Sequence, residues 1–306
     1  MDWILFPALF MAWAVGVNDS AKVVGTAVGS ELLGFKKGVF VIAVFTTTGA
    51  VFGGGGVSGT ISELAKGLDA YSIGIILFSA AVAVTLASIR GLPISTTQSI
   101  VGGLVGAALT FNLIVKWEIL FKIVLAWVLS PLLAAFLAIM VYEVYVKLFK
   151  KIKQIQLLET MYKWLVFIAV AFSAFNLGAN ELSNVVGLME AISIDGSFKL
   201  VLSLTLGFGA LTFSHEVIMS VGKRLTPLDP LSAFSSQFAS AMAVTTANLF
   251  GLPVSSGQAV VGGVAGLGYH LDNPINWGLI RSIVLSWIFA PLISGILTFL
   301  LLSLLP

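Results

Sequence analysis

The sequence predicts an all-α polytopic membrane protein built from two inverted-topology repeats of about five transmembrane segments each, with broken or re-entrant helices. Three observations lead to this prediction. Apolar residues make up 58% of the 306 residues and charged residues only 10%, whereas a soluble globular domain has about 25% charged residues. The apolar residues fall in long runs, and the runs of the two halves share sequence motifs.

Long apolar runs mark the candidate segments, because a helix needs about 20 mostly apolar residues to span the hydrocarbon core. They cover 3–30, 37–56, 71–90, 94–110 and 116–149 in the first half, and 162–190, 198–219, 231–250, 254–270 and 275–305 in the second. The runs at 94–110 and 254–270 are short and begin just after Pro93 and Pro253. Each is interpreted as a half-helix, an arm of a re-entrant hairpin or a tilted crossing.

Comparison of the chain with itself reveals the duplication. Residues 91–106 (GLPISTTQSIVGGLVG) match residues 251–266 (GLPVSSGQAVVGGVAG) at nine of sixteen positions, with an offset of 160. Residues 16–25 (GVNDSAKVVG) match residues 178–187 (GANELSNVVG) with an offset of 162. Each half has five segments, an odd number, so the second half enters the membrane from the opposite side. Such inverted repeats are typical of secondary transporters.

The distribution of Lys and Arg predicts the orientation, because cytoplasmic loops carry an excess of these residues. If the N-terminus is outside and all ten segments cross, the inner side receives Lys36, Lys37, Arg90, Lys147, Lys150, Lys151, Lys153, Lys163, Lys223 and Arg224, and the outer side Lys66, Lys116 and Lys199. We therefore expect a multi-pass protein of the cell membrane with both termini extracellular. The first repeat is 1–149, a cytoplasmic linker is 150–163, and the second repeat is 164–306. The linker is either a solvated connector or an amphipathic interfacial helix.

A proline followed by hydroxyl residues occurs once in each half, within apolar surroundings. The proline ends the preceding helix, and the serine two residues later can cap the next one. The first N–H groups of that helix lack intrahelical partners and lie at its positive end, so two such starts facing each other suit a small tetrahedral oxyanion. The candidate anion ligands are Ser95, Thr96, Thr97 and Gln98, and Ser255, Ser256, Gly257 and Gln258. A single copy would favour an ordinary capped helix, but the symmetric pair favours a site.

The other repeated motif places polar residues in the middle of apolar runs: Asn18, Asp19, Asn180, Glu181 and Asn184. A glycine precedes each group, at 16 and 178, and permits local unwinding of the helix. Freed carbonyls with carboxylate and amide oxygens are hard ligands, so Asn18, Asp19, Asn180 and Glu181 form a candidate sodium site. A carboxylate could instead carry a proton or accept a hydrogen bond from protonated phosphate. Alternatively, these side chains only satisfy backbone groups at a helix break, although an intramembrane carboxylate is costly without a task.

Lys22 occupies the position that Asn184 fills in the second half. It follows Asp19 by three residues, on the same helix face. A buried ammonium needs a partner, and Asp19 or Glu181 is the natural candidate. Such a lysine would stand in for one sodium ion as a fixed cation. Alternatively, it extends toward the membrane interface and has no part in coupling.

Several other functions are excluded by what the chain contains. Cysteine is absent, and the two histidines, His215 and His270, form no ligand motif, which argues against a zinc or haem centre. The net charge of +2, without a basic cluster, argues against nucleic-acid binding. No metal-binding motif and no general-base pair outside the candidate cation site are present. We therefore expect no enzyme activity and no cofactor besides a coupling ion, sodium or a proton.

The paired motifs resemble those of a known family of membrane proteins. The Gly-x-Asn-Asp/Glu motifs at 16–19 and 178–181 are similar to the duplicated Gly-Ala-Asn-Asp-x-x-Asn signature of the inorganic phosphate transporter (PiT) family, which includes sulfate permeases. The Leu-Pro-x-Ser motifs at 92–95 and 252–255, and Gly-Lys-Arg-Leu-Thr-Pro at 222–227, are similar to that family as well. The resemblance spans nearly the whole chain.

The resemblance implies cation-coupled import of an oxyanion by inverted repeats, usually in a homodimer. It implies that Ser95, Thr96, Thr97, Ser255 and Ser256 hold the anion, and that Asn18, Asp19, Asn180, Glu181 and Asn184 hold cation or substrate. Three residues depart from the family pattern. Lys22 replaces the second asparagine of the first motif, Glu181 replaces an aspartate, and Gly257 replaces a hydroxyl residue.

These departures bear on the substrate and the coupling ion. Phosphate at neutral pH carries a hydroxyl that can donate to Asp19 or Glu181, whereas sulfate carries none and is repelled by a carboxylate. We therefore expect a secondary active transporter that imports phosphate with sodium or a proton by alternating access. The alternatives are a sulfate permease of the same family, proton-coupled with Lys22 as a fixed cation, and a passive anion channel.

Overall fold

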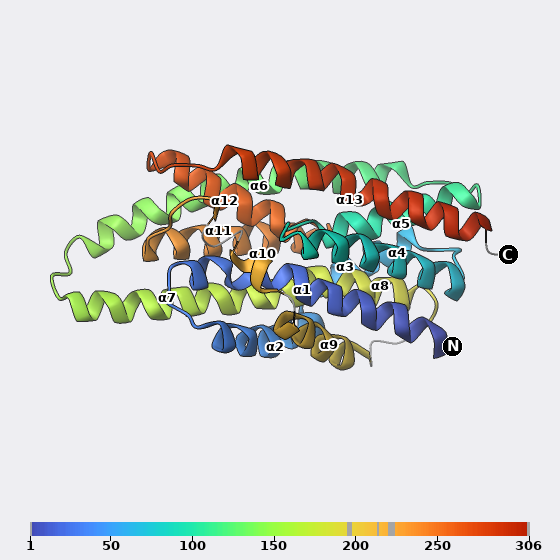
Figure 1. Ribbon diagram of the computed structural model, residues 1–306, viewed down its shortest axis with the longest axis horizontal. Coiled ribbons are helices and arrows are strands. Elements are labelled where there is room, and N and C mark those ends of the chain that lie inside the picture. Colours follow the sequence, from blue (N-terminus) through green and yellow to red (C-terminus); the bar gives the residue numbers. More distant parts are fainter. Residues whose placement is uncertain (1, 195–197, 213, 220–223, 305–306) are drawn as a thin grey trace.

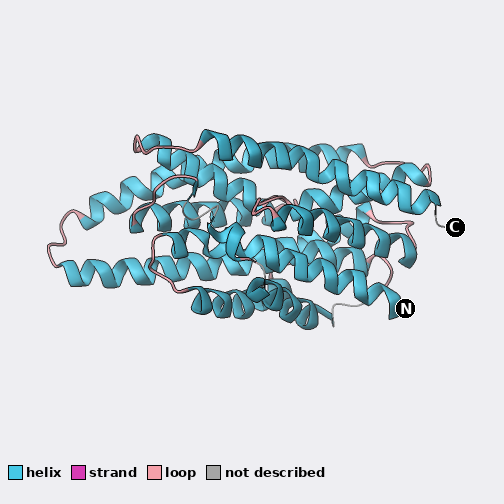
Figure 2. Cartoon of the chain, viewed as in Figure 1, coloured by secondary structure: helices cyan, strands magenta, loops and turns pink. Residues whose placement is uncertain are grey.

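The computed structural model describes residues 2–194, 198–212, 214–219 and 224–304, and all regular secondary structure in this part of the chain is helical (Figures 1 and 2). The all-α prediction is confirmed. Five described helical stretches are long and apolar enough to cross a membrane: Phe35–Phe52, Ala70–Ile89, Trp117–Phe149, Ile155–Glu190 and Trp277–Leu304. The first helix, with 25 residues, and the helix that begins at Pro230, with 20, are also long enough, but both contain several buried polar residues.

The helices of the two halves follow the same order. The first half contains a 3₁₀ turn at Asp2–Ile4, then α1 Leu5–Gly29, α2 Phe35–Phe52, α3 Gly55–Leu64, α4 Ala70–Ile89, α5 Thr96–Thr110 and α6 Trp117–Phe149. The second contains α7 Ile155–Asn176, a π-helical turn Leu177–Leu182, α8 Ser183–Glu190, α9 Lys199–Thr212, α10 His215–Met219, α11 Pro230–Leu249, α12 Ser256–His270 and α13 Trp277–Leu304.

Three boundaries differ from the prediction. The run at 37–56 is divided between α2 and α3, because the chain turns at Gly53 and Gly54 against α8; a Cβ at position 54 would lie 1.9 Å from Ser183 Oγ. The run at 198–219 is divided between α9 and α10. Most of the expected linker 150–163 is helical, since α7 already begins at Ile155.

The two short segments are arms of re-entrant hairpins. The turns between α4 and α5 and between α11 and α12 meet in the interior of the molecule (Figure 1). There the hydroxyl of Thr97 lies 3.2 Å from the carbonyl oxygen of Val254. The supposition that all ten segments cross is therefore wrong for these arms, and Arg90 lies at a hairpin tip and not in an inner loop. When the two hairpin arms are left out, three segments of each half remain. This number is still odd, so the second half is still inverted relative to the first.

The two halves pack against each other reciprocally. A Cβ on Gly102 of α5 would lie 2.2 Å from the carbonyl oxygen of Pro291 in α13, and one on Gly262 of α12 would lie 2.3 Å from that of Pro131 in α6. All four residues obey the offset of 160. Both termini lie at one end of the molecule and the connection 150–154 lies at the other (Figure 1), so α6 and α13 run in opposite directions. A two-fold relation between inverted halves produces this arrangement.

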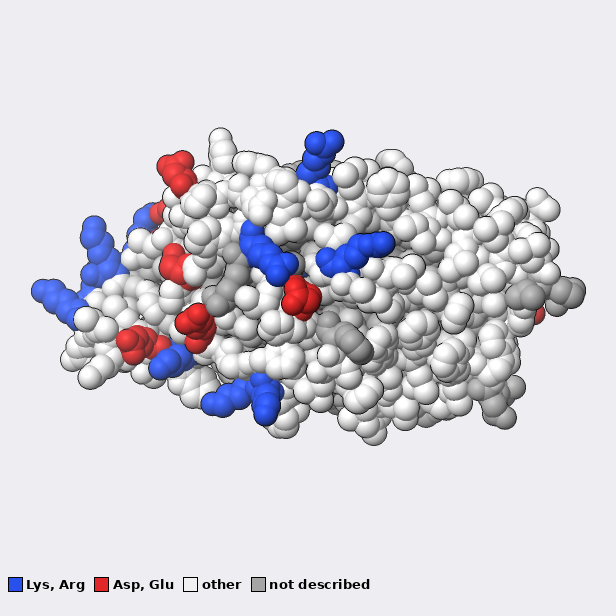
Figure 3. Space-filling model, in the orientation of Figure 1, with Lys and Arg blue, Asp and Glu red and all other residues white. Residues whose placement is uncertain are grey.

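The periphery differs from the centre in the way a bilayer requires. The helices α6 and α13 expose large apolar side chains along most of their length, whereas α1, α4 and the π turn are mainly buried. On the face shown in Figure 3, charged side chains gather toward the end of the molecule that carries the connection 150–154. The end with the termini shows almost none. The buried centre, where the two hairpin turns meet, holds the polar motifs.

Candidate functional site

Each hairpin turn is folded by its own Gly-Leu-Pro-x-Ser motif. Gly91 and Gly251 have φ angles of 66° and 65°, the left-handed conformation that glycine adopts without a steric penalty, and they end α4 and α11. The N–H of the following leucine donates across the turn to the carbonyl of Ala87 or Ala247, at 3.1 and 3.0 Å. The proline then prevents continuation of the helix.

The serines of these motifs cap the next helices, as predicted. Ser95 Oγ accepts a hydrogen bond from the N–H of Gln98 at 3.1 Å, and Ser255 Oγ accepts one from Gln258 at 3.3 Å. These are N-caps of α5 and α12. The hydroxyls of Thr96 and Ser256 belong to the first residues inside the two helices. The two positive helix ends therefore open onto the same interior space.

The asparagines of the second motif hold the hairpin turns in place. Asn18 Oδ1 accepts from the N–H of Ile94 at 3.1 Å, and its Nδ2 donates to Leu92 O at 3.0 Å and to Ser88 Oγ at 2.7 Å. Asn180 Oδ1 accepts from the N–H of Val254 at 3.2 Å, and its Nδ2 donates to the carbonyl of the same residue at 2.6 Å. In this conformation both side chains stabilise the backbone beside the site.

The carboxylates lie between the two helix starts. Thr96 Oγ1 is 2.7 Å from Asp19 Oδ2 and 2.6 Å from Glu181 Oε2, and Thr97 Oγ1 is 2.7 Å from the same Glu181 oxygen. The other oxygen of Glu181 accepts from the hydroxyl and the N–H of Ser256, at 2.7 and 3.3 Å. One carboxylate from the second half thus receives hydrogen bonds from the first turn of α5 and the first turn of α12.

The length of Glu181 explains this bridging role. Asp19 contacts Thr96 of its own half, and Glu181 contacts Ser256 of its own half in the equivalent way, since Thr96 and Ser256 obey the offset of 160. Glutamate has one methylene more than aspartate, and it also reaches Thr96 and Thr97 of the other half. The donors predicted for an oxyanion are occupied by a carboxylate of the chain itself.

Lys22 lies in the site and does not extend to the interface. Its side chain is 1% exposed and forms an ion pair with Asp19. The equivalent residue, Asn184, is fully buried and donates from Nδ2 to Thr97 Oγ1 at 3.0 Å. Gly257 packs directly against the end of the Lys22 side chain.

All predicted site residues converge on this centre, and every one with a side chain except Ser256 is at most 5% exposed. The side-chain oxygens of Gln98 and Gln258 have no hydrogen-bond partner among the described residues, and neither does Asn184 Oδ1. Buried polar atoms are normally paired, so these oxygens mark free ligand capacity. In the described part of the chain, no cluster of three His, Cys, Asp or Glu residues suits a transition metal.

One expectation about the backbone is wrong. Unwinding was expected at both Gly16 and Gly178, but α1 continues as a regular helix through the first motif. Gly16 instead allows close packing, because a Cβ there would lie 1.9 Å from the carbonyl oxygen of Leu206 in α9. At Gly178 the helix widens into the π turn, and Ser183 Oγ donates to the Gly178 carbonyl at 3.0 Å. Such π turns often occur at functional sites.

Sequence reasoning missed a group of polar residues next to the site. Gln237 of α11 donates from Nε2 to Lys22 O at 2.8 Å and to Ser173 Oγ at 2.7 Å, and its Oε1 accepts from Thr26 at 2.8 Å. It therefore connects α1, α7 and α11. A cavity of about 20 Å³ beside it is lined by Lys22 and Ser256 among others, which is enough for about one water molecule. The polar run SSQFAS within an apolar segment was the available signal.

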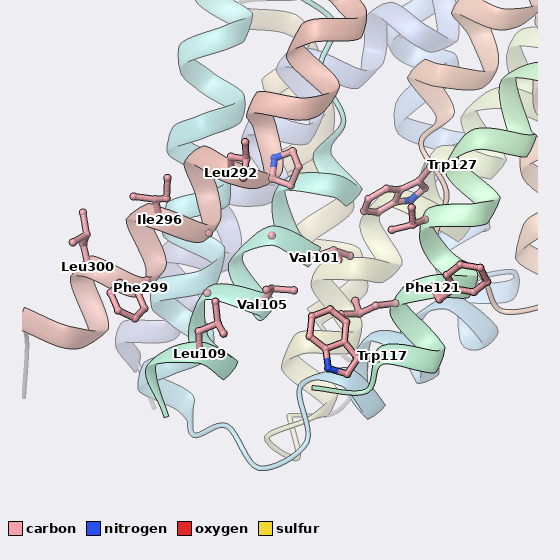
Figure 4. Close-up of a pocket in the computed structure, with 16 residues that line it drawn as sticks. Val101, Val105, Leu109, Trp117, Phe121, Trp127, Leu292, Ile296, Phe299 and Leu300 are labelled. Atoms are coloured by element: carbon pink, nitrogen blue, oxygen red, sulfur yellow. The ribbon is translucent and has the colours of Figure 1, made fainter. Parts of the chain in front are cut away.

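A large apolar cavity lies away from this site. It has a volume of about 810 Å³ between α5, α6 and α13, and Val105, Leu109, Trp117 and Phe299 are among its lining residues (Figure 4). No charged side chain lines it. A groove of this kind on peripheral helices suits lipid chains or an apolar helix face, and it cannot bind an oxyanion.

The described part of the motif at 222–227 begins at Arg224, which is exposed at the surface. Gly222 and Lys223 are outside the described residues. Arg224 Nη2 contacts Glu216 Oε2 at 3.3 Å, and His215 Nδ1 lies 3.7 Å from Glu216 Oε1, all on exposed side chains. His215, Glu216 and Arg224 therefore form a polar group at the surface.

The fold and site together define a polytopic membrane protein with a buried, charged site between two similar halves. The sequence matches the family model of the phosphate transporter family at residues 15–159 and 147–298. An inferred phosphate permease of Methanocaldococcus jannaschii is 30% identical over 97% of this chain and 95% of its own length. The chain belongs to the phosphate transporter family.

Two further similarities agree with this assignment. The chloroplastic inorganic phosphate transporter 2-1 of Arabidopsis thaliana is 26% identical over 91% of this chain and 68% of its own length. The solved structure of a sodium-dependent phosphate transporter has the same fold, with a TM-score of 0.82 and 23% identity, and the similarity covers 100% of this chain and 99% of that one.

Proposed function

We propose that this chain is a secondary active transporter that imports inorganic phosphate together with a cation. One observation carries the proposal. The first turns of α5 and α12, one from each half, direct hydroxyl and N–H donors at a single buried carboxylate, that of Glu181. Membership of the phosphate transporter family supports phosphate as the substrate.

The anion would bind where the Glu181 carboxylate lies. A phosphate oxygen can accept the same hydrogen bonds from Thr96, Thr97 and Ser256, and helix starts favour it electrostatically. The caps Ser95 and Ser255 and the two glutamines, 98 and 258, complete the predicted ligand set. The unpaired side-chain oxygens of the glutamines can accept a hydrogen bond from a hydroxyl of phosphate. Phosphate also carries a proton at neutral pH and can donate it in a hydrogen bond to Asp19, which sulfate cannot do.

A coupling cation is expected because the site buries two carboxylates beside an incoming anion. Buried charges must be compensated. The candidate ligands are oxygens of Asp19, Glu181 and the asparagines 18, 180 and 184, which suit sodium, and a sodium-dependent relative supports that ion. A proton is the second candidate. Thr96 has one hydroxyl proton and cannot donate to both carboxylates at once, so a proton bound to one carboxyl group would complete the second hydrogen bond.

Transport would proceed by alternating access. The site is closed on all sides in this conformation, so phosphate reaches it only when the halves or their hairpins move and Glu181 releases its donors. The inner end is assigned to the connection 150–154, with both termini extracellular, since Lys and Arg concentrate around that connection in the sequence. A homodimer is expected by family resemblance.

Uphill uptake tests the proposal. The purified protein in liposomes should accumulate ³²P-phosphate above the external concentration when a sodium or proton gradient is imposed, and should stop when the gradient is dissipated. Unlabelled sulfate should compete weakly. Equilibration without accumulation would identify a passive channel, and sulfate accumulation indifferent to phosphate would overturn the assigned substrate.

A further inference from the structure

Lys22 is a fully enclosed cation at the centre of the candidate site. Its side chain is 1% exposed and pairs with Asp19, one turn earlier on α1. Asp19 in turn contacts Thr96 at the start of α5. A buried ammonium is costly unless it is paired, and an isolated lysine near a helix end would extend to the interface instead. Its location therefore indicates a role in the charge balance of the site.

The chain makes room for this cation at one position of the opposite half. A Cβ on Gly257, the second residue of α12, would lie 2.8 Å from Lys22 Cε and 3.3 Å from Lys22 Nζ. The end of a lysine can usually move away from such a contact, but this one is enclosed and ion-paired. A larger side chain at 257 and the ammonium at its present place exclude each other.

The two positions equivalent to 22 and 257 in the other repeats are also in contact, but they carry different residues. Position 97 is equivalent to 257 by the offset of 160, and position 184 is equivalent to 22 by the offset of 162. There Asn184 Nδ2 donates to Thr97 Oγ1 at 3.0 Å, while Asn184 Oδ1 has no hydrogen-bond partner among the described residues. One copy of the pair thus holds an ammonium and a glycine, and the other holds a neutral amide, a hydroxyl and a free buried oxygen.

The charges of the two copies differ accordingly. Asp19 is paired with Lys22, a cation of the chain itself, whereas Glu181 has hydrogen-bond donors around it but no cationic side chain within ion-pair distance among the described residues. When an oxyanion takes over those donors, the charge at Glu181 must be compensated by a mobile cation or a proton. Asp19 needs no such ion.

We propose that Lys22, in the space left by Gly257, is a tethered cation that replaces one coupling ion. This protein would then carry one cation fewer per phosphate than a transporter with asparagine at both equivalent positions, 22 and 184. The inference rests on the proposed function for its meaning in transport. Its structural content, an ammonium in a place that a mobile cation could fill, can be tested without transport.

The experiment makes the first copy resemble the second. The variants are Lys22→Asn, Gly257→Thr, and both together, with Lys22→Met as a shape control that removes the charge without leaving room for an ion. Gly55→Ala is the background control, because nothing lies within 4 Å of a Cβ at that exposed position. Size-exclusion profiles in detergent show which variants fold.

The first readout is thermal stability in detergent without phosphate, in sodium chloride against choline chloride and at several pH values. A ligand that binds only the folded state raises its stability. Lys22→Asn and the double variant should be stabilised by sodium, or by protons, more than wild type, and Lys22→Met should not. An equal response of wild type and Lys22→Asn would overturn the proposal. If Lys22→Asn alone does not fold, the double variant, which restores the Asn–Thr contact, decides the question in the same way.

The second readout is the cation dependence of ³²P-phosphate uptake by liposomes. Lys22→Asn should lower uptake roughly tenfold at low cation concentration, recover at high concentration, and show one more cation per phosphate than wild type. Gly257→Thr alone should be impaired and should improve when Lys22→Asn is added. An unchanged stoichiometry in Lys22→Asn contradicts the inference. A wild-type protein that fails to accumulate phosphate would refute the proposed function, while the stability readout would still decide the role of Lys22.

Discussion

The first arms of the two hairpins, α4 and α11, occupy equivalent places in the fold but have different linings. At three aligned positions α4 carries Ile76, Leu77 and Ala80, and α11 carries Ser236, Gln237 and Ser240. All six residues are buried. The α11 arm lies toward the end of the molecule with the connection 150–154 (Figure 1). At these positions the lining of the α4 arm is apolar and that of the α11 arm is polar.

This difference shows which features belong to the scaffold and which to function. The hairpin turns, the caps and the close contacts at Gly102 and Gly262 are the same in both halves. The polar side chains on α11, like the Lys22–Gly257 pair, occur in one half only. We infer that symmetry builds the anion site and that departures from symmetry determine its coupling and its inner opening.

The largest effect is expected from removing donors of both hairpins at once. Thr96→Val with Ser256→Ala takes one hydroxyl from α5 and one from α12, and hydrogen bonds to a charged group contribute about 1.5–3 kcal/mol each. The two losses together amount to about 3–6 kcal/mol, so phosphate affinity should fall by roughly 100-fold or more. Thr110→Val is the matched control, because its hydroxyl bonds to Gly106 O at the far end of α5. If phosphate binds the double variant normally, the two helix starts are not the site.

Substitutions at the two close contacts test the equivalence of the hairpins. Gly102→Ala and Gly262→Ala should each destabilise the protein strongly, because the new Cβ would meet backbone of α13 or α6 at 2.2 or 2.3 Å, and overpacking typically costs about 1–3 kcal/mol or more. Thermal melting in detergent measures the effect. A large loss in one variant and none in the other would break the proposed two-fold relation.

Exchange of the aligned pair 77 and 237 tests the difference between the arms. Gln237→Leu leaves Lys22 O, Ser173 and Thr26 without their present partner, and each buried group left unpaired costs about 1–3 kcal/mol. We expect lower thermal stability and slower phosphate uptake. Leu77→Gln should lower the thermal stability of the protein but should not slow phosphate uptake to the same extent. Equal effects of the two changes on uptake would show that α11 has no special role.

The smallest effect concerns the caps that start the two arms. Asp69 accepts from the N–H of Ser72 at 2.9 Å, and Asp229 accepts from Leu231 and Ser232 at 2.8 and 3.0 Å. Replacing either by Ala should cost about 1 kcal/mol of stability. The hydrogen bonds from Ser72 lower the pKa of Asp69 below its usual value. Its contribution is therefore present at neutral pH and is lost as the pH falls through the lowered pKa.

A melting series from neutral to acidic pH checks the cap at Asp69. The difference in melting temperature between wild type and Asp69→Ala should shrink toward acidic pH. Asn at position 69 should keep most of the stability, because its side-chain oxygen can still cap the helix. A difference that stays constant with pH would mean that the carboxylate charge does not contribute.

Much of this architecture is predictable because the duplication is written in the sequence. The offset of 160 identifies both Gly-Leu-Pro-x-Ser turns, and proline and serine chemistry predicts a helix end and a helix cap at each. The convergence of Asp19 and Glu181 on the helix starts also follows, since a polar motif in an apolar segment must face other polar groups.

The remaining features depend on distances that no pattern encodes. The reach of Glu181 across the halves results from one methylene, and the contact between Lys22 and Gly257 joins residues 235 positions apart. Glycine suggests flexibility and gave the wrong expectation at Gly16, where its task is close packing against Leu206. Gln237 was visible as a polar residue in an apolar run, but its three partners come from α1 and α7.

The central claim is that an oxyanion binds between the starts of α5 and α12 in place of the Glu181 carboxylate. A crystal structure with arsenate, a phosphate analogue with an anomalous signal, tests it most directly. We predict an arsenic peak within hydrogen-bond distance of Thr96 and Ser256, with the Glu181 side chain moved away from both. A peak at another place, with Glu181 still bonded to Ser256 as it is here, would contradict the account.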